Sequence, residues 1–252
     1  MSTPQGRFAD LARTGDRGAL VTVLEGPAAG AKLLVLPDGA RHGSLGSPEI
    51  DDDAAHHAVE LMWAERSEQR GSLFVDATFP PPRLVIFGAI DIARELCSLA
   101  RVSGWRPYVI DPRGFFARPD RFPDAEEVVA AWPEEGFARI GGIDRATWIA
   151  VLTHDPKLDD AALGIALRSE AAYVGAMGSR GMQSQRHERL LELGLSGEEM
   201  DRLSAPIGLD LGAITPEETA LSIMSEVVAL RRGRQGGRLR FAEGRIHEVG
   251  AE

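Results

Sequence analysis

The chain has 252 residues, with 28 Lys and Arg against 38 Asp and Glu, and its net charge of −10 argues against a general nucleic-acid surface. Its 44% hydrophobic and 26% charged residues are typical of a globular chain that buries a core, which excludes disorder for most of the length. No apolar run approaches the roughly 18 residues of a membrane span, and residues 1–10 lack the apolar stretch of a signal peptide, so we expect a cytoplasmic protein. Cys97 is the single cysteine, which excludes an intrachain disulfide and a metal site built on several thiolates.

A run of prolines, Pro80 to Pro82, marks the clearest domain boundary. Proline cannot donate a backbone hydrogen bond, and consecutive prolines stiffen the chain. We therefore expect a small mixed α/β domain over residues 1–79, a proline linker over 80–82, a Rossmann-like domain over 83–232 and a tail over 233–252.

Short strands and one helix are expected in the N-terminal domain. Residues 19–24 and 31–36 are short apolar runs separated by a turn that contains glycine and proline, a pattern typical of strands. Residues 54–66 repeat apolar side chains at helical spacing, and Asp51 to Asp53 place negative charge where the positive end of a helix is expected. The sequence thus predicts a helix that starts at the three aspartates.

Strands alternate with helices throughout the C-terminal domain. The expected strands are residues 84–87, 108–110, 128–130, 148–152 and 171–174. A final helix is indicated by Thr215, Pro216 and Glu218, the pattern of a capping box. Because such alternation requires right-handed crossovers, the fold class is α/β, with a doubly wound parallel sheet and with Gly88 and Asp111 at the ends of neighbouring strands.

The turn Gly88-Ala89-Ile90-Asp91 stands where a dinucleotide-binding fold has its glycine-rich loop, and Asp111 follows at about the spacing of the ribose-binding acid. Ile90 replaces the glycine that lets a pyrophosphate approach the backbone, and Asp91 repels phosphate at the helix N-terminus. The residues therefore favour a plain strand-to-helix turn, and binding of NAD(P) or a flavin dinucleotide is not expected.

Polar groups gather directly after the strand that ends at Leu152. His154 supplies an imidazole, Asp155 and Asp159 supply carboxylates, and Lys157 supplies an ammonium group. Ligands of open α/β sheets bind beyond the carboxyl ends of the strands, so this turn is a candidate site. The alternative is that Asp155 or Asp159 caps the next helix while His154 is a solvated loop residue, and the residues alone leave both possibilities open.

The next strand runs into a turn suited to an anion. Gly175 and Gly178 permit close backbone approach, Ser179 can serve as an N-cap, and Arg180 supplies a planar donor to phosphate or carboxylate. Together with the His154 turn, this segment predicts a crevice for a small polyanionic ligand. The glycine loop from Gly208 to Gly212 is either a third part of that crevice or a connector that needs positive φ angles.

Other residues that often carry chemistry are expected to be structural. His56 and His57 are adjacent on one helix and cannot easily share a metal, so a solvated helix face is favoured and no metal site is assigned. Cys97 shares the apolar face of its helix, which predicts a small buried side chain and not a reactive thiolate.

Several blocks of the C-terminal domain together resemble one known family. The blocks are Tyr108–Arg113 (YVIDPR), Arg121–Ala125 (RFPDA), Thr153–Asp160 (THDPKLDD), Tyr173–Arg180 (YVGAMGSR) and Gly208–Ala213 (GLDLGA). In this order and spacing they are similar to the XdhC/CoxI family of accessory proteins for xanthine dehydrogenase and related molybdenum hydroxylases. The resemblance implies that the chain binds the molybdenum cofactor, protects it during sulfuration and delivers it to the apo-enzyme.

The resemblance also implies binding residues and partners. It implies that the molybdopterin phosphate rests on the segment from Gly175 to Arg180, which includes Gly178 and Ser179, and that the pterin lies near His154, Asp155 and the loop around Asp210. Gly88 and Asp111 complete the cofactor-binding set, and no catalytic residue is assigned because the implied role is binding and transfer. The expected partners are a molybdenum hydroxylase apo-enzyme, a cysteine desulfurase and a second copy of the chain in a homodimer.

This chain departs from the family pattern at two places. The usual GxGH-like turn is here Gly88-Ala89-Ile90-Asp91, and the glycine-cysteine stretch of the N-terminal domain is here Gly46-Ser47-Pro48-Glu49, without a thiol that could relay sulfur. Two alternative functions remain. One is an NAD(P)-dependent oxidoreductase with His154 as acid/base, against which Ile90 and Asp91 argue, and the other is a non-binding scaffold that engages a partner protein.

Overall fold

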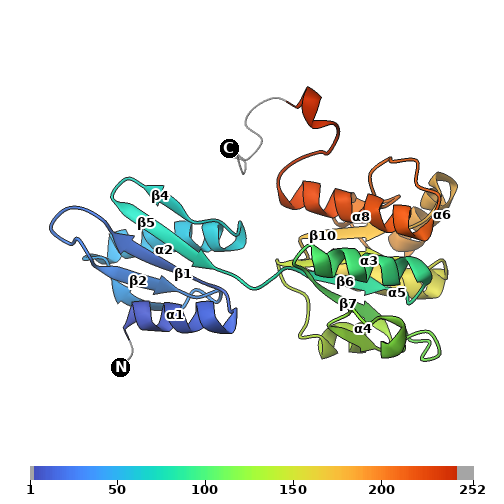
Figure 1. Ribbon diagram of the computed structural model, residues 1–252, viewed down its shortest axis with the longest axis horizontal. Helices are drawn as coiled ribbons and strands as arrows, with labels where there is room; N and C mark the ends of the chain where they lie inside the picture. Colours follow the sequence, from blue (N-terminus) through green and yellow to red (C-terminus); the bar gives the residue numbers. More distant parts are fainter. Residues whose placement is uncertain (1–2, 243–252) are drawn as a thin grey trace. The chain divides into compact units, whose positions relative to one another are not determined.

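The computed structural model describes residues 3–242, with the exception of the Arg180 side chain. The chain forms two compact units, Met1–Pro81 and Pro82–Glu252 (Figure 1). The expected tail contains a short 3-10 helix, η2 (Leu239–Phe241), and residues 243–252 lie outside the described part. No helix within residues 3–242 combines the length and the apolar character that crossing a bilayer requires.

The N-terminal unit is an antiparallel sheet of five strands in the order β3-β2-β1-β5-β4. Its elements are α1 (Pro4–Thr14), β1 (Gly18–Val23), β2 (Lys32–Val35), β3 (Arg41–Ser44), α2 (Pro48–Trp63), β4 (Glu68–Arg70) and β5 (Leu73–Thr78). Ala19, Val21 and Val35 pack with the buried alanines of α2 on one face of the sheet. Leu11 of α1 reaches Gly18 on the other face, so each face has its own helix.

Helix α2 begins earlier than the aspartate run predicts. Ser47 is its N-cap and accepts a hydrogen bond from the Ile50 backbone N–H at 3.4 Å, and Pro48 occupies the first turn. Asp51 lies inside the helix and accepts from the Leu45 N–H at 2.6 Å. The expectation that the three aspartates start the helix is therefore wrong, because a serine cap followed by proline is the stronger start signal.

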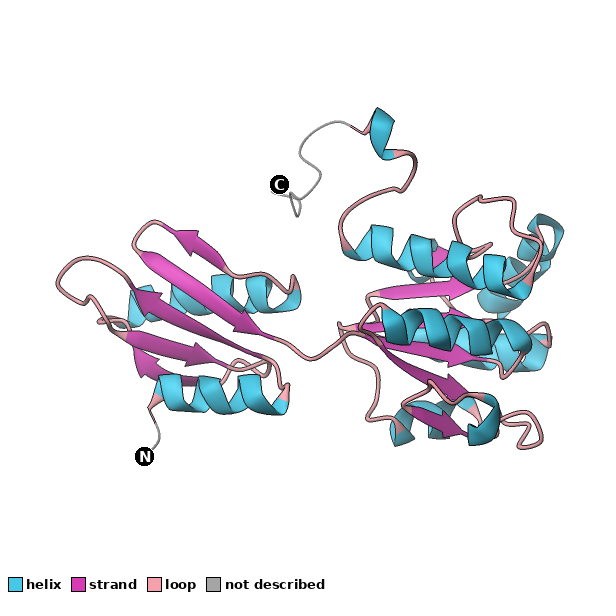
Figure 2. Cartoon of the chain, viewed as in Figure 1, coloured by secondary structure: helices cyan, strands magenta, loops and turns pink. Residues whose placement is uncertain are grey.

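The C-terminal unit is a parallel sheet of six strands in the order β11-β10-β9-β6-β7-β8, which confirms the expected doubly wound fold (Figure 2). Its strands are β6 (Arg83–Phe87), β7 (Arg106–Ile110), β8 (Glu127–Val129), β9 (Thr147–Val151), β10 (Tyr173–Ala176) and β11 (Leu203–Ser204). Its helices are α3 (Asp91–Val102), η1 (Pro119–Arg121), α4 (Pro133–Arg139), α5 (Pro156–Arg168), α6 (Arg180–Glu192), α7 (Gly197–Asp201) and α8 (Pro216–Arg231). The capping box of Thr215 and Glu218 at the start of α8 is present as predicted.

Two apolar cores cover the two faces of this sheet. Leu84 and Ile86 of the central strand pack with α3 and α8, whereas Val85 and Phe87 pack with α4, α5 and α6. Every residue from Leu84 to Phe87 is buried because helices lie on both faces. Figure 1 shows α3 and α8 side by side over the same face.

The strand order locates the point where the sheet reverses its winding. From β6 the chain adds β7 and β8 on one side, and then it crosses to add β9, β10 and β11 on the other. In open α/β sheets, ligands bind outside the carboxyl ends of the strands at such a switch point. The boundary between β6 and β9 is therefore the centre of the candidate site.

Candidate functional site

Gly88 brings the turns that follow β6 and β9 into direct contact. Its φ of +112° is favourable only for glycine, and a Cβ here would lie 2.9 Å from Cγ2 and 3.1 Å from the backbone N of Thr153. Helix α3 starts at Asp91, and its N-cap residue, Ile90, makes no side-chain capping hydrogen bond. The backbone at the switch point is therefore closely packed against Thr153, and position 88 requires glycine.

Asp111 at the end of β7 is fully buried and its carboxylate is already occupied. It accepts hydrogen bonds from the Ala89 N–H at 2.8 Å and from the backbone N and Nε of Arg113, both at 2.9 Å. Burial acts to raise the pKa of Asp111, but the hydrogen bonds from Arg113 and Ala89 outweigh it and hold that pKa below its usual value. A ribose hydroxyl would have to displace Arg113 to reach this carboxylate.

Arg121 covers the Gly88 turn from the loop after β7. It donates to the Ala89 carbonyl at 3.1 Å and to the Phe116 carbonyl at 3.0 Å, and it pairs with Asp91 at 3.3 Å. This pair offsets the negative charge of Asp91 at the start of α3. The sequence did not reveal the pair, and it leaves Ile90 as the main obstacle to a pyrophosphate.

These contacts lead to a prediction about dinucleotides. We expect NAD(H) to bind poorly, because Ile90 stands where a dinucleotide-binding loop needs glycine and Asp111 is held by Arg113. Titration calorimetry measures this, and the double variant Ile90→Gly, Asp91→His is expected to bind more tightly than the wild-type chain. Tight binding of NAD(H) to the wild-type chain would contradict the argument.

The turn after β9 combines a cap with an exposed imidazole. Asp155 is the N-cap of α5 and accepts from the Lys157 N–H at 2.9 Å, which is one of the two possibilities left open by the sequence. His154 is exposed beside it. The hydrogen bond to Asp111 and, to a smaller extent, the negative charge of Asp155 raise the pKa of Arg113.

Asp159 is a buried partner of Arg186 and not a helix cap. Arg186, only 2% exposed, donates to Asp159 at 3.0 Å and to the Met177 carbonyl at 2.6 Å. Thr153 donates its hydroxyl to the same carboxylate. Burial raises the pKa of Asp159, and the bonds from Thr153 and Arg186 offset this only in part. Hydrogen bonds from Thr153 to Asp159, from Arg186 to Asp159 and from Arg186 to Met177 therefore connect the turn after β9 to the turn after β10.

Gly175 and Gly178, near the end of β10, have different structural roles. Gly175 lies within β10, where a Cβ would meet the Tyr173 hydroxyl at 2.5 Å and Ile207 at 2.6 Å, so its small size serves packing. Gly178 has a φ of +140°, and a Cβ there would lie 3.4 Å from a terminal nitrogen of Arg186. The turn therefore runs directly over a buried guanidinium group.

Helix α6 begins at Arg180, whose backbone is described while its side chain is not. Ser179 is the N-cap, as predicted, but its hydroxyl makes no capping hydrogen bond. The Nε of Arg186 also has no hydrogen-bond partner among the described residues. Helix N–H groups, a hydroxyl and a buried cation meet at this turn, which is a combination that suits an anion.

The glycine loop before α8 is anchored from below by one carboxylate. Glu226 accepts hydrogen bonds from the Gly208 N–H, the Tyr173 hydroxyl and the Ser204 hydroxyl, each at 2.6 Å. Gly208 has a φ of +105°, so the connector interpretation of this loop is geometrically satisfied. Asp210 is exposed at the top of the loop.

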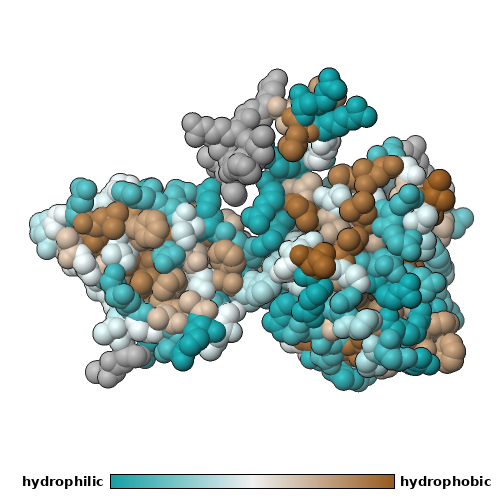
Figure 3. Space-filling model, viewed as in Figure 1, coloured by the Kyte–Doolittle hydropathy of each residue, from teal (hydrophilic) through white to brown (hydrophobic). Residues whose placement is uncertain are grey.

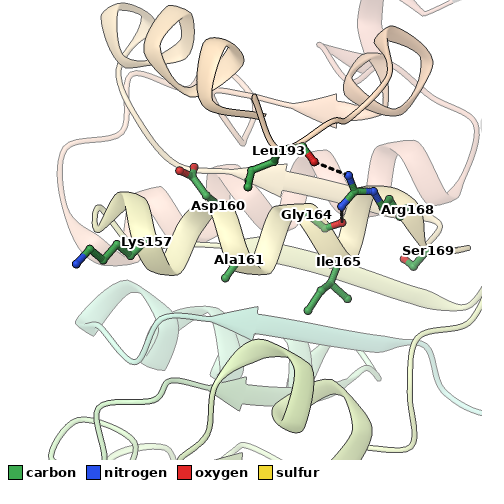
Figure 4. A pocket seen from close by; sticks show the side chains of 8 residues that line it. All are labelled: Lys157, Asp160, Ala161, Gly164, Ile165, Arg168, Ser169 and Leu193. Atoms are coloured by element: carbon green, nitrogen blue, oxygen red, sulfur yellow. Dashed lines mark hydrogen bonds between the residues drawn. The ribbon is translucent and has the colours of Figure 1, made fainter. Parts of the chain in front are cut away.

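Two of the hollows of this unit lie beside helices α5, α3 and α8. One of about 740 Å³ runs along α5, where Arg168 donates to the carbonyls of Gly164 and Leu193 (Figure 4). The other, of about 430 Å³, lies between α3 and α8 and is lined in part by the exposed side chains of Val102 and Leu221. Figure 3 shows hydrophobic side chains scattered over this unit. Neither hollow contains a residue that the sequence assigns to cofactor binding.

Comparison with protein families identifies the fold and the site blocks together. Residues 84–227 match the family model described as the XdhC Rossmann domain, and residues 11–72 match the model described as the XdhC and CoxI family. The chain belongs to the XdhC and CoxI family. All the strand-end turns described above, from Gly88 to Gly208, lie within the first match.

The individual relatives are 25–29% identical to this chain over the matched residues. The chain is 26% identical over 200 residues to a probable xanthine dehydrogenase subunit from Bacillus subtilis, covering 79% of this chain and 57% of the relative. It is 29% identical over 152 residues to the molybdenum cofactor insertion chaperone PaoD of Escherichia coli, covering 60% of this chain and 41% of the relative. The chain thus spans about half the length of the curated relatives it matches.

A solved structure shares the architecture. The crystal structure of a xanthine dehydrogenase from Bacillus halodurans matches with a TM-score of 0.64 and 28% sequence identity, over 91% of this chain and 67% of the other. The similarity extends over most of the chain, so it includes parts of both compact units.

Proposed function

We propose that this chain binds the molybdenum cofactor, assists its sulfuration and hands it to an apo-enzyme of the xanthine dehydrogenase type. Membership of the XdhC and CoxI family and the similarity to a molybdenum cofactor insertion chaperone support this role. The observation that carries it is the Gly178 turn, which leads into the start of α6 and lies against the buried guanidinium group of Arg186. A phosphate group fits this donor set.

The cofactor in this proposal is a cargo that the chain binds and hands on. Different strand-end turns would bind its phosphate and its pterin. Gly178, Ser179 and Arg180 would hold the phosphate. His154 and Asp155, exposed after β9, would face the pterin, and the exposed loop of Asp210, which follows β11, would border the phosphate on the side away from β9. Gly88 and Asp111 would fix the backbone at the base of the site, and Gly175 would allow β10 to pack closely against Tyr173 and Ile207. These residues bind and position, and none is assigned to catalysis.

The proposed partners follow from the same role. A molybdenum hydroxylase apo-enzyme would receive the cofactor, a cysteine desulfurase would supply sulfur, and two copies of the chain would form a homodimer in the cytoplasm. Cys97 is the only cysteine in the sequence, and it is fully buried. We therefore propose that sulfur passes from the desulfurase to the cofactor without a relay thiol of this chain.

Cofactor retention tests the function directly. The purified chain is mixed with molybdenum cofactor released from a molybdenum hydroxylase, separated by gel filtration and assayed for bound pterin, and then it is mixed with the apo-hydroxylase to measure recovered activity. We expect the pterin to elute with the chain and activity to return. A chain that retains no pterin would favour the scaffold alternative.

Arg180→Ala is expected to weaken cofactor binding at least tenfold, because a guanidinium group is a bidentate donor to phosphate and a lost charged hydrogen bond is worth about 1.5–3 kcal/mol. His154→Ala is expected to change affinity less and transfer more, since an exposed imidazole after β9 would position the ligand but does not supply the donors proposed to hold its phosphate. Gel filtration and reconstitution measure the two effects separately. Arg139→Ala, in the last turn of α4, is the control and should change neither.

Cys97→Ser is expected to leave cofactor binding and transfer unchanged. Cys97 is fully buried, and burial raises the pKa of its thiol to about 12, so almost no nucleophilic thiolate is present at neutral pH. The same reconstitution assay measures this. Loss of transfer in Cys97→Ser, with an unchanged melting temperature, would show that the thiol takes part.

A further inference from the structure

Two adjacent phenylalanines lie exposed on the loop that follows β7. Phe115 is 77% exposed and Phe116 is 39% exposed. Large aromatic side chains usually bury most of their surface, so an exposed pair beside a ligand-binding edge calls for a binding role. The loop starts at Asp111, at the same carboxyl edge of the sheet as the switch point.

The loop is held firmly in place. The Phe116 N–H donates to the Arg113 carbonyl at 2.8 Å, and Arg113 is itself bound to the buried Asp111. Arg121 donates to the carbonyls of both Phe116 and Ala89, which ties the loop to the Gly88 turn. The two rings are therefore presented on a fixed backbone, so a ligand would not have to order the loop.

The two rings differ in what they contact. The Arg113 guanidinium lies 4.8 Å from the centre of the Phe116 ring, and Arg121 lies 5.9 Å from it. The Phe115 ring meets Phe116 edge to face, with centres 5.4 Å apart and planes at 84°. Phe116 is thus engaged by its neighbours and braces Phe115, whose ring keeps most of its surface open.

We propose that Phe115 is a stacking platform for a flat heteroaromatic ring, which under the proposed function is the pterin of the cofactor. The charge of Arg113 is balanced by Asp111, so this part of the edge attracts a ring by face contact and not by net charge. The loop after β7 and the Gly178 turn are three strand spacings apart, about 14 Å. An elongated ligand with a ring at one end and a phosphate at the other would therefore use both.

The test compares variants of Phe115 in the full chain. The probe is molybdenum cofactor released from a molybdenum hydroxylase, and its affinity is measured together with the near-ultraviolet circular dichroism of the bound pterin. Stacking on an aromatic side chain is worth about 1–3 kcal/mol, so Phe115→Ala and Phe115→Leu should each lose about tenfold in affinity and lose the dichroic band. Phe115→Trp should keep both.

Val102→Ala is the matched control. Val102 is 82% exposed and is the last residue of α3, at the end of the helix that is remote from the Gly88 turn. It should bind like the wild-type chain. If the wild-type chain binds the pterin and Phe115→Ala binds it equally well, the stacking inference is overturned while the proposed function stands. If Phe115→Ala lowers transfer alone, the ring contacts a partner protein and the inference is again overturned. If the wild-type chain binds no pterin, both proposals fail.

Discussion

Replacing Arg186 with methionine is expected to lower the free energy of unfolding of the C-terminal unit by about 3–5 kcal/mol, because the substitution leaves Asp159 buried without its counter-charge. Asp159 and Arg186 are both 2% exposed, so water cannot replace the lost partner. The Met177 carbonyl loses a donor in the same step. Urea unfolding followed by circular dichroism, with separate transitions for the two units, measures the change.

A neighbouring ion pair provides the control. Asp160 and Arg189 also join α5 to α6, at 2.7 Å, but their side chains are 16% and 31% exposed. Arg189→Met should cost no more than about 1 kcal/mol, since water reaches this pair. The double variant Arg186→Met, Asp159→Leu should recover much of the lost stability, because an apolar pair leaves no charge buried. Equal losses in Arg186→Met and Arg189→Met would contradict this account.

Glu226→Ala is expected to destabilise the C-terminal unit by about 3 kcal/mol and to loosen the loop from Gly208 to Gly212. Glu226 accepts three hydrogen bonds at 2.6 Å, and its removal leaves the buried Tyr173 hydroxyl and the Gly208 N–H without an acceptor. Thermal unfolding measures the stability. Hydrogen exchange at the Gly208 and Leu209 amides, which donate to Glu226 and to the Ser222 carbonyl, measures the opening of the loop. The loop should exchange faster even where the rest of the unit stays folded.

Two further variants separate the contributions of Glu226. Tyr173→Phe removes one of the three donors and should cost about 1 kcal/mol without loosening the loop. Glu226→Gln keeps the shape of the side chain and should fall between the other two. If loop exchange is as slow in Glu226→Ala as in the wild-type chain, the loop is held by other contacts, such as the hydrogen bond of 2.5 Å from the Ser222 hydroxyl to the Leu209 carbonyl.

Local patterns along the chain were enough to predict the parallel sheet. Each strand of this unit from β6 to β10 contains a short apolar run next to a turn or helix signal, so its existence and direction follow from neighbouring residues. The position of Asp155 as a possible cap was also predictable, because the cap acts on a residue two positions away. The N-terminal helix α1 was not predicted, because it has no buried residue and so lacks a clear apolar stripe.

The pairings that build the site could not be predicted from the sequence. Asp159 and Arg186 are on different helices, and nothing in their spacing or in their neighbours indicates that they meet. The same holds for Asp91 and Arg121. The sequence suggested that the His154 and Gly178 turns were neighbours, but the strand order was needed to place Gly88 beside them. Long-range pairing depends on this order, which short-range patterns do not encode.

The central position of β6 sets a requirement on how the chain is made. One neighbour of β6, the strand β7, follows it closely, but the other, β9, begins only at Thr147. During synthesis, one edge of β6 stays open with Leu84 to Phe87 unprotected until β9 has left the ribosome. Open apolar edges pair readily with other chains. Fragments that end between β8 and β9 should therefore aggregate, whereas a break after α8 would leave the sheet complete.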